Sequence, residues 1–325
     1  MKNILVIGTG GTITMKIDKQ KGGSIPSFQV NDLVRSLPKI NNLNNVDVYE
    51  FSNIPSPYMN VERMNNLANL VRKKVKNYDG IIITHGTDTL EETAYFLDLA
   101  LNTKKPVVLT AAMRSSNDLG NDGLRNIWAA LKTVTSKHYT GEIGVTVVLN
   151  DEIYAARDVT KTYTSNVSTF RAPLFGALGI VDNDRVSFYN KPSKRIDIDF
   201  DKAEDSVALI KAYSGMNNDI IENLIDHRYK GLVIEAFGRG NLPEWMESSI
   251  EKAIDNDMIV VISSRCYMGR VLGDYAYKGG GKKLEELGAI FASNLRGLKA
   301  RILLMFVIGK YGTDREKTKK IFNKL

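Results

Sequence analysis

The sequence predicts an α/β protein with a mostly parallel, doubly wound sheet and a second, smaller α/β domain. Two observations carry this prediction. Short apolar runs alternate with longer amphipathic segments along the first half of the chain, which is typical of parallel strands joined by helices on both faces of a sheet. A charged stretch without periodicity then separates this part from a second, shorter series of apolar runs.

Each element of the first series follows from its length and spacing. Runs of strand length predict strands at residues 3–9, 46–51, 80–84, 106–110 and 142–149. Longer amphipathic segments predict helices at residues 60–77, 89–102 and 121–137. Ligands in such folds bind outside the carboxyl ends of the strands. We therefore expect the chemistry in the turns that follow the strands.

The charged stretch marks a domain boundary. It spans residues 190–206, “NKPSKRIDIDFDKAEDS”, and carries no sustained period. We predict an N-terminal α/β catalytic domain at 1–190, a linker at 191–206 and a smaller C-terminal α/β domain at 207–325. In the last, apolar runs occur at 207–213, 231–237 and 258–264, separated by helical segments, and then at 299–309.

Composition excludes several classes of protein. The 325 residues are 43% hydrophobic and 25% charged, as in an ordinary globular protein, with a net charge of +7. The basic stretches are short and interrupted, which favours solvated helix faces over a nucleic-acid site. Lys2 is followed by too few apolar residues for a signal peptide, and the apolar stretch 302–308 is too short to span a bilayer. We expect a cytoplasmic protein that binds neither nucleic acid nor membrane.

The scarcity of cysteine and histidine narrows the chemistry. One cysteine, Cys266, permits neither an internal disulfide nor a cysteine metal cluster. The three histidines are widely spaced and form no H-E-x-x-H pattern, which argues against a zinc hydrolase. A serine triad would have to use His85, and no G-x-S-x-G pattern accompanies it. A hydrolytic nucleophile and base are therefore expected among Thr, Asp, Lys and Tyr.

The first glycine turn, in “ILVIGTGGTITM” at residues 4–15, follows a predicted buried strand. Gly8 and Gly10 fit the dinucleotide-binding pattern G-x-G-x-x-G, but its third glycine is replaced by Ile13 and no helical pattern follows. A tight turn without chemistry is a further interpretation. Thr12 keeps a catalytic interpretation open, because its hydroxyl lies just past the strand's carboxyl end.

A second turn, in “THGTDTLEETA” at residues 84–94, carries a hydroxyl and a carboxylate. Thr87 and Asp88 lie between the predicted strand at 80–84 and a helix that we expect to begin near a Thr89–Glu92 capping box. The start of a helix favours anionic oxygen. Without other evidence, Asp88 is equally well explained as a neighbour of the cap, and His85 as a packed residue at the strand end.

A third polar segment, residues 156–170, contains Lys161 among hydroxyl side chains. A surface loop rich in Ser and Thr is the commoner explanation of such a segment. If Lys161 lay beside Thr87 and Asp88, however, its amine would form a base relay that accepts a threonine proton.

Five motifs along the chain carry a resemblance to a known family. They are “TGGTI” (9–13), “THGTDTLEETA” (84–94), “TAAMRSSNDLGNDG” (110–123), “RDVTKT” (157–162) and “GRGNLP” (238–243). In this order and spacing they resemble the bacterial-type L-asparaginases, in their cytoplasmic form, over essentially the whole chain. The resemblance implies hydrolysis of L-asparagine to L-aspartate and ammonia, a step of asparagine catabolism, with no metal or organic cofactor. It also implies a homotetramer formed as a dimer of dimers.

The resemblance also implies roles for particular residues. Thr12 would be the nucleophile that forms an acyl-enzyme, while Thr87, Asp88 and Lys161 would handle protons and activate water. Asp88 would also pair with the substrate's α-ammonium group. Backbone N–H groups at Gly11 and Thr87 are expected to stabilise the oxyanion.

Three further positions match substrate-binding residues of that family. Ser56 would bind the α-carboxylate, and the backbone of Ala112 would face the leaving amide. Asn241 would reach into the site of a neighbouring subunit, which requires at least a dimer. Without the resemblance, Ser56 is a turn residue between two prolines and Asn241 caps a turn before Pro243.

The sequence departs from the family pattern in three places. The segment after the first turn has Ser24 near the position of the family's lid tyrosine, and no tyrosine occurs from 13 to 48. Tyr58, Tyr275 and Tyr277 are candidates for the group that polarises Thr12. Pro57 and Tyr58 stand where secreted members have Gln-Asp, and “YAYKGGGKKL” (275–284) lacks their glutamate. Two other functions stay open: an amidase of the same mechanism with another substrate (D-asparagine, glutamine or a peptide amide), and a non-catalytic ligand-binding protein.

Overall fold

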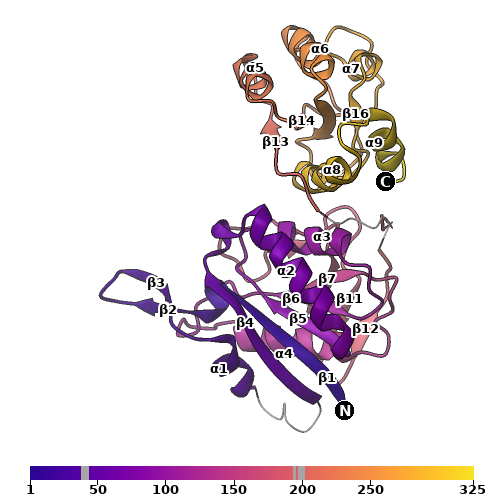
Figure 1. Ribbon diagram of the computed structural model, residues 1–325. Helices are drawn as coiled ribbons and strands as arrows, with labels where there is room; N and C mark the ends of the chain where they lie inside the picture. Colours follow the sequence, from indigo (N-terminus) through magenta and orange to yellow (C-terminus); the bar gives the residue numbers. More distant parts are fainter. Residues whose placement is uncertain (38–43, 193–194, 197–201) are drawn as a thin grey trace. The chain divides into compact units, whose positions relative to one another are not determined.

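The computed structural model describes residues 1–37, 44–192, 195–196 and 202–325, except for the side chains of Pro26 and Asn44. These residues form two compact units, Met1–Arg195 and Ile196–Leu325 (Figure 1). Much of the linker predicted at 191–206 lies outside the described residues. Of its described part, Arg195 pairs with Asp98 in the first unit, and the Glu204 N–H donates to the Met305 carbonyl in the second.

The first unit is built on an eight-stranded sheet with the order β12-β11-β8-β7-β6-β5-β1-β4. Its strands are β1 (Lys2–Gly10), β4 (Asn44–Ile54), β5 (Gly80–Thr84), β6 (Val107–Thr110), β7 (Val145–Leu149), β8 (Glu152–Ala155), β11 (Gly179–Val181) and β12 (Val186–Phe188). The five strands from β4 to β7 are parallel, and the last three are added antiparallel. The predicted fold class is confirmed, as are the five predicted strands.

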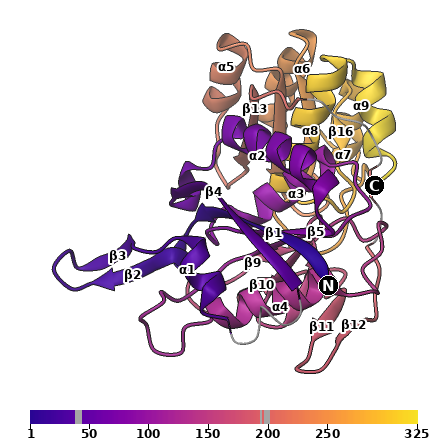
Figure 2. The same ribbon diagram turned by 60° about the horizontal axis from the view of Figure 1, so that its bottom comes forward.

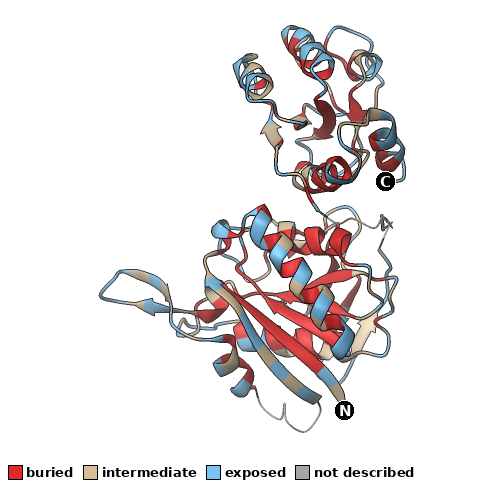
Figure 3. Ribbon diagram, in the orientation of Figure 1, coloured by how far each residue is buried: buried red, intermediate tan, exposed pale blue. Residues whose placement is uncertain are grey.

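Helices cover both faces of this sheet (Figure 2). On one face, α1 (Val30–Arg35) and α4 (Gly123–Thr135) pack with alternate strand residues such as Ile4 and Val6. On the other lie α2 (Val61–Lys74) and α3 (Leu90–Ala100), close to the predicted helices at 60–77 and 89–102. Alternation of side chains along a strand explains why both faces are apolar and buried (Figure 3).

Two small hairpins extend from this unit, and the sequence pattern did not predict either. After the 3-10 turn η1 (Thr12–Thr14), β2 (Met15–Asp18) pairs with β3 (Gly23–Pro26). Within the polar segment 156–170, β9 (Thr160–Lys161) pairs with β10 (Phe170–Arg171). The second hairpin gives Lys161 a defined position, which a solvated loop would not.

The second unit contains a parallel sheet in the order β13-β14-β15-β16. Its elements are β13 (Val207–Lys211), α5 (Asp219–Asp226), β14 (Gly231–Ala236), α6 (Glu247–Asp255), β15 (Ile259–Ser264), α7 (Gly281–Leu287), β16 (Ile290–Phe291), α8 (Gly297–Tyr311) and α9 (Arg315–Phe322). The apolar run 299–309 lies in helix α8, unlike the three runs before it, because an apolar run buried all round suits a helix as well as a strand. Among the described residues, no helix is long and apolar enough to cross a bilayer.

The order of the strands defines where a ligand would bind in the first unit. The chain passes from β1 to β4 on one side of β1 and then returns to β5 on its other side. The strand order therefore reverses between β1 and β5, and their carboxyl ends lie next to each other. This is the switch point at which open α/β sheets bind ligands. β1 is thus an interior strand, one position from the edge strand β4.

Candidate active site

The glycine turn after β1 is held directly against the loop after β5. Gly11 has φ +87°, and a Cβ atom built on it would lie 2.3 Å from the Cα of Gly86. Glycine is therefore required at position 11 for its backbone conformation and for this close approach. The chain then enters η1 and β2 and forms no helix, so the interpretation as a dinucleotide-binding turn lacks its helix. Thr12, the first residue of η1, lies at the switch point.

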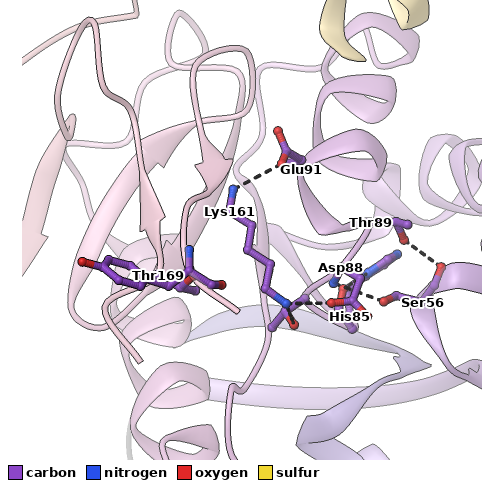
Figure 4. A network of polar contacts seen from close by, with 10 residues as sticks. Ser56, His85, Asp88, Thr89, Glu91, Lys161 and Thr169 are labelled. Carbon is purple, nitrogen blue, oxygen red and sulfur yellow. Dashed lines mark hydrogen bonds and ion pairs between the residues drawn. The ribbon is translucent and has the colours of Figure 1, made fainter. Parts of the chain in front are cut away.

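The loop after β5 is in turn held against Ser56. A Cβ atom built on Gly86 would lie 2.7 Å from both Cβ and Oγ of Ser56, which begins the 3-10 turn η3 (Ser56–Tyr58). The Asp88 N–H donates to Ser56 Oγ at 3.2 Å (Figure 4). Among the described residues the Ser56 hydroxyl donates to no acceptor, so its own proton is available to a ligand. Three loops thus meet at Gly11, Gly86 and Ser56.

The capping box predicted at Thr89 and Glu92 is wrong. Thr89 occupies the N-cap position of α3, but its side chain makes no cap hydrogen bond. Its hydroxyl instead donates to the Ser56 carbonyl at 2.7 Å. A threonine hydroxyl at a helix start can bond the backbone outside the helix, and here it fastens the loop that carries Ser56 to the loop that carries Asp88.

Lys161 extends from β9 to the same loop (Figure 4). Its Nζ donates to Thr87 Oγ1 at 2.9 Å and to Asp88 Oδ1 at 2.7 Å. The Lys161 side chain is 17% exposed, whereas that of Asp88 is 59% exposed. Exposed ion pairs contribute at most about 1 kcal/mol to stability. This ion pair therefore contributes little to stability, and the Asp88 carboxylate is open to solvent.

The structure corrects the expected oxyanion donors. The Gly11 N–H donates to the Ile54 carbonyl at 3.2 Å, so it is not available to a ligand. This contact arises because β4 continues alongside the turn, where Gly10 pairs with Ile54. The N–H groups of Thr12 and Thr87, by contrast, have no hydrogen-bond acceptor among the described residues. Thr12 and Thr87 are therefore the better pair of donors.

His85 is a buried support of the Gly86–Asp88 loop. The ring lies between the Gly86 carbonyl, 2.8 Å from Nδ1, and Thr93 Oγ1, 3.0 Å from Nε2. A carbonyl only accepts, so Nδ1 carries the proton and Nε2 accepts from the Thr93 hydroxyl. Burial lowers the pKa of His85 to about 4. The ring is therefore neutral at physiological pH, which agrees with the interpretation of His85 as a packed residue at the strand end.

The buried His85 predicts a loss of stability in mild acid. An unfolded chain takes up the proton near pH 6.5, whereas the folded chain resists it down to about pH 4. The contribution of neutral His85 to the free energy of unfolding, about 3 kcal/mol, is fully present above pH 6.5 and is lost as the pH falls to 4. His85→Asn places an amide N–H near the position of Nδ1 without a titratable group. Urea unfolding of this variant should show a smaller drop in free energy between pH 7 and pH 4 than the wild type. Equal drops would contradict the assignment.

Ala112 lies in the loop after β6, beside the turn that carries Thr12. A Cβ atom built on Gly123 would lie 3.5 Å from the Ala112 Cβ and 3.1 Å from Ile13 Cγ1. Asp122 holds this loop by accepting the N–H groups of Met113 and Arg114. Nothing in the sequence pattern indicated this role for Asp122.

No described residue of the first unit hydrogen-bonds to the Thr12 hydroxyl. Ser24, near the position of the family's lid tyrosine, lies in the β2–β3 hairpin and shares a 2.8 Å hydrogen bond with Ser115. Of the three tyrosine candidates, Tyr58 is 62% exposed in η3. Tyr275 and Tyr277 belong to the second unit, where their ring centroids are 5.8 Å apart.

Asn241 also belongs to the second unit. It forms an isolated bridge with Phe237, and its Oδ1 accepts the Gly281 N–H at 3.0 Å. Within this unit its side chain supports the start of α7. Its expected role in a neighbouring subunit stays a prediction.

Comparison with known proteins supplies the family. Residues 3–194 match the family model described as Asparaginase, N-terminal, and residues 206–322 match the one described as Glutaminase/Asparaginase C-terminal domain. The chain belongs to the asparaginase family. It is accordingly an enzyme of the amidohydrolase class.

Relatives of this asparaginase-family enzyme cover nearly the whole chain. It is 34% identical to a probable periplasmic L-asparaginase of Haemophilus influenzae over 95% of this chain and 89% of the relative. A probable cytoplasmic L-asparaginase from Campylobacter jejuni, known from a crystal structure, is 33% identical in sequence to this chain. The two structures align over 100% of each chain with a TM-score of 0.88. A component of the glutamyl-tRNA(Gln) amidotransferase of Pyrococcus abyssi is 33% identical over 95% of this chain and 72% of that protein. The names of these relatives differ in substrate and in compartment.

Proposed function

We propose that the protein is an L-asparaginase, which hydrolyses the side-chain amide of L-asparagine to L-aspartate and ammonia. One observation carries the proposal. The Lys161 ammonium group is held by Thr87 and Asp88 in a loop that contacts the turn bearing Thr12. This brings together a hydroxyl nucleophile, a proton-transfer group and a carboxylate open to solvent.

The side chains around the loop suit the α-amino acid end of the substrate. Asp88, whose carboxylate is largely exposed, would pair with the α-ammonium group. Ser56 Oγ accepts the Asp88 N–H and has a proton to donate to the α-carboxylate, because it donates to no described residue. These two contacts would direct the side-chain amide of asparagine toward Thr12.

The reaction proceeds in two steps. Thr12 Oγ attacks the amide carbon, and the N–H groups of Thr12 and Thr87 stabilise the oxyanion. The C–N bond breaks as Thr12 Oγ loses its proton to the relay and the nitrogen receives one from it; ammonia leaves, and an aspartyl ester remains on Thr12. Water then attacks this ester, aspartate leaves, and Thr12 recovers its proton. Lys161 relays protons through the Thr87 hydroxyl, 2.9 Å from its Nζ. In each step the ammonium group gives a proton to the leaving atom, and the resulting amine takes up the proton released by the attacking oxygen.

The proposal is tested by product analysis. Purified protein treated with a chelator should release aspartate and ammonia in equal amounts from L-asparagine. Faster turnover of D-asparagine or of a peptide amide would assign the same mechanism to another substrate. Tight binding of asparagine without ammonia release would instead favour a ligand-binding protein.

We expect a strong preference for asparagine over glutamine. Glutamine is longer by one methylene group, so its amide and its α-ammonium group cannot both occupy their positions. The departures at Pro57 and Tyr58 remove polar groups that would hold a displaced amine. Mismatches of this kind are worth about 1–3 kcal/mol or more, so kcat/KM should differ at least about tenfold. Similar kcat/KM values for the two amino acids would refute this expectation.

We further propose that the enzyme acts as a homo-oligomer, formed as a dimer of dimers. The proposal rests on the match of Asn241 to a family residue that completes the site of a neighbouring subunit. In a closed dimer, such sharing gives two equivalent sites. Activity should therefore fall when sedimentation shows dissociation on dilution, and Asn241→Ala should weaken substrate binding in the intact oligomer. A fully active monomer would exclude a shared site.

We also propose that the enzyme is cytoplasmic, because the similar protein from Campylobacter jejuni is named as a probable cytoplasmic L-asparaginase. The Haemophilus influenzae relative is named as periplasmic, so the compartment requires a direct test. Fractionation of cells that express the native gene should recover the activity with cytoplasmic markers. Release of the activity with periplasmic markers would overturn this assignment.

A further inference from the structure

The segment that leads into α3, residues 87–91, contacts Lys161 at both of its ends. At the tip, Nζ bonds Thr87 and Asp88, just before the helix. At the backbone, the Lys161 N–H donates to Glu91 Oε1 at 3.2 Å (Figure 4). The same oxygen accepts the Thr160 hydroxyl at 3.0 Å. Lys161 is thus held at backbone and tip by one continuous segment, residues 87–91.

The strand that carries Lys161 needs such support. β9 has two residues, and its ladder with β10 consists of the pairs Lys161–Phe170 and Thr160–Arg171. Two-stranded ladders of this kind are marginal without packing against other elements. A lysine side chain also has four rotatable bonds, so its tip is fixed only if its backbone is fixed. Glu91, a buried residue of α3 that is 6% exposed, links β9 to this helix through these two hydrogen bonds.

We propose that Glu91 is a positioning residue for amide hydrolysis, which holds β9 so that the Lys161 ammonium group stays beside Thr87 and Asp88. This inference rests on the proposed function. Glu91 acts through Lys161, because its bonds with β9 reach the Thr160 hydroxyl and the Lys161 backbone N–H, at the opposite end of the lysine from its ammonium group. The two donors from β9, a backbone N–H and a hydroxyl, are neutral, so the amide oxygen of glutamine should accept the same two bonds.

The kinetic test compares Glu91→Leu with Glu91→Gln. The leucine variant should lower kcat for L-asparagine at least tenfold with KM within about twofold, because Ser56 and Asp88 still bind substrate. The glutamine variant should stay within about threefold of the wild type. In a Lys161→Met background, Glu91→Leu should change the residual kcat less than twofold, since a residue that acts through Lys161 has nothing left to position. An equal tenfold loss in that background would overturn the proposal.

A second readout does not depend on activity. Trace acetylation of lysines, followed by peptide mass spectrometry, should show Lys161 reacting several-fold faster in Glu91→Leu than in the wild type or in Glu91→Gln. Lys230, which pairs with Glu204 in the second unit, serves as the matched control and should not change. If Glu91→Leu does not fold, Thr160→Val removes one of the two bonds from β9 to Glu91 and should also raise the Lys161 rate. Unchanged Lys161 labelling in a folded variant would refute the positioning role.

The two readouts separate this inference from the proposed function. If the labelling responds but no asparagine is hydrolysed, the positioning of Lys161 stands and the substrate assignment fails. If asparagine is hydrolysed but neither kcat nor labelling responds to Glu91→Leu, the function stands and the role of Glu91 fails.

Discussion

Thr12→Ala is expected to abolish nearly all asparagine hydrolysis while leaving the fold intact. Without the hydroxyl no acyl-enzyme forms, and removal of a nucleophile typically lowers kcat by about 10³-fold or more. The Thr12 hydroxyl bonds no described residue of the first unit, so its loss should cost little stability. Steady-state ammonia release and thermal unfolding of the same preparation measure both effects.

Thr12→Ser is the matched control for this variant. Serine keeps the hydroxyl and loses one methyl group, so a substantial part of kcat should return. If Thr12→Ala turned over asparagine at close to the wild-type rate, the nucleophile would have to be sought elsewhere in the site.

Lys161→Met is expected to have the second largest effect. Methionine keeps most of the length of the side chain but removes the ammonium group that bonds Thr87 Oγ1 and Asp88 Oδ1. Loss of a group that transfers protons in the transition state costs about 10²–10⁴-fold in kcat. Because Asp88 and Ser56 remain, KM should change far less than kcat.

Lys230→Met provides a control for the loss of an ion pair as such. Lys230 Nζ lies 2.6 Å from Glu204 Oε2, a separation close to that between Lys161 and Asp88. The control should keep its activity, because Lys230 lies in the second unit and takes no part in the Lys161–Thr87–Asp88 contacts. Lys161→Met with near-wild-type turnover would remove the proton relay from the mechanism.

Most of the fold could be predicted because periodicity and length are local properties. The strand at 80–84 and the helix that follows were recognisable from five buried residues and a run at helical spacing. The hairpin that carries Lys161 was not, because two-residue strands have no period to detect. Helix α8 illustrates a further limit, since a run that is apolar on every side does not distinguish helix from strand.

The site residues that directly follow a predicted strand could be identified from the sequence. Thr12, Thr87 and Asp88 follow β1 and β5, and the topology brings these two loops together. The contacts that refine the site join residues far apart in sequence. The Thr160 hydroxyl donates to Glu91, which lies 69 residues before it in the sequence. The Gly11 N–H donates to the Ile54 carbonyl because β4 continues past the turn. No local pattern encodes the register of two strands, so the Gly11 donor was assigned wrongly.

The central claim, an acyl-enzyme formed from L-asparagine, is tested most directly by partition to hydroxylamine. Hydrolysis of L-asparagine and of the β-methyl ester of L-aspartate would pass through the same aspartyl ester on Thr12. With hydroxylamine present, the ratio of aspartyl hydroxamate to aspartate should therefore be the same from both substrates, although their rates differ. Different ratios, or asparagine hydrolysis without any hydroxamate, would contradict a shared covalent intermediate.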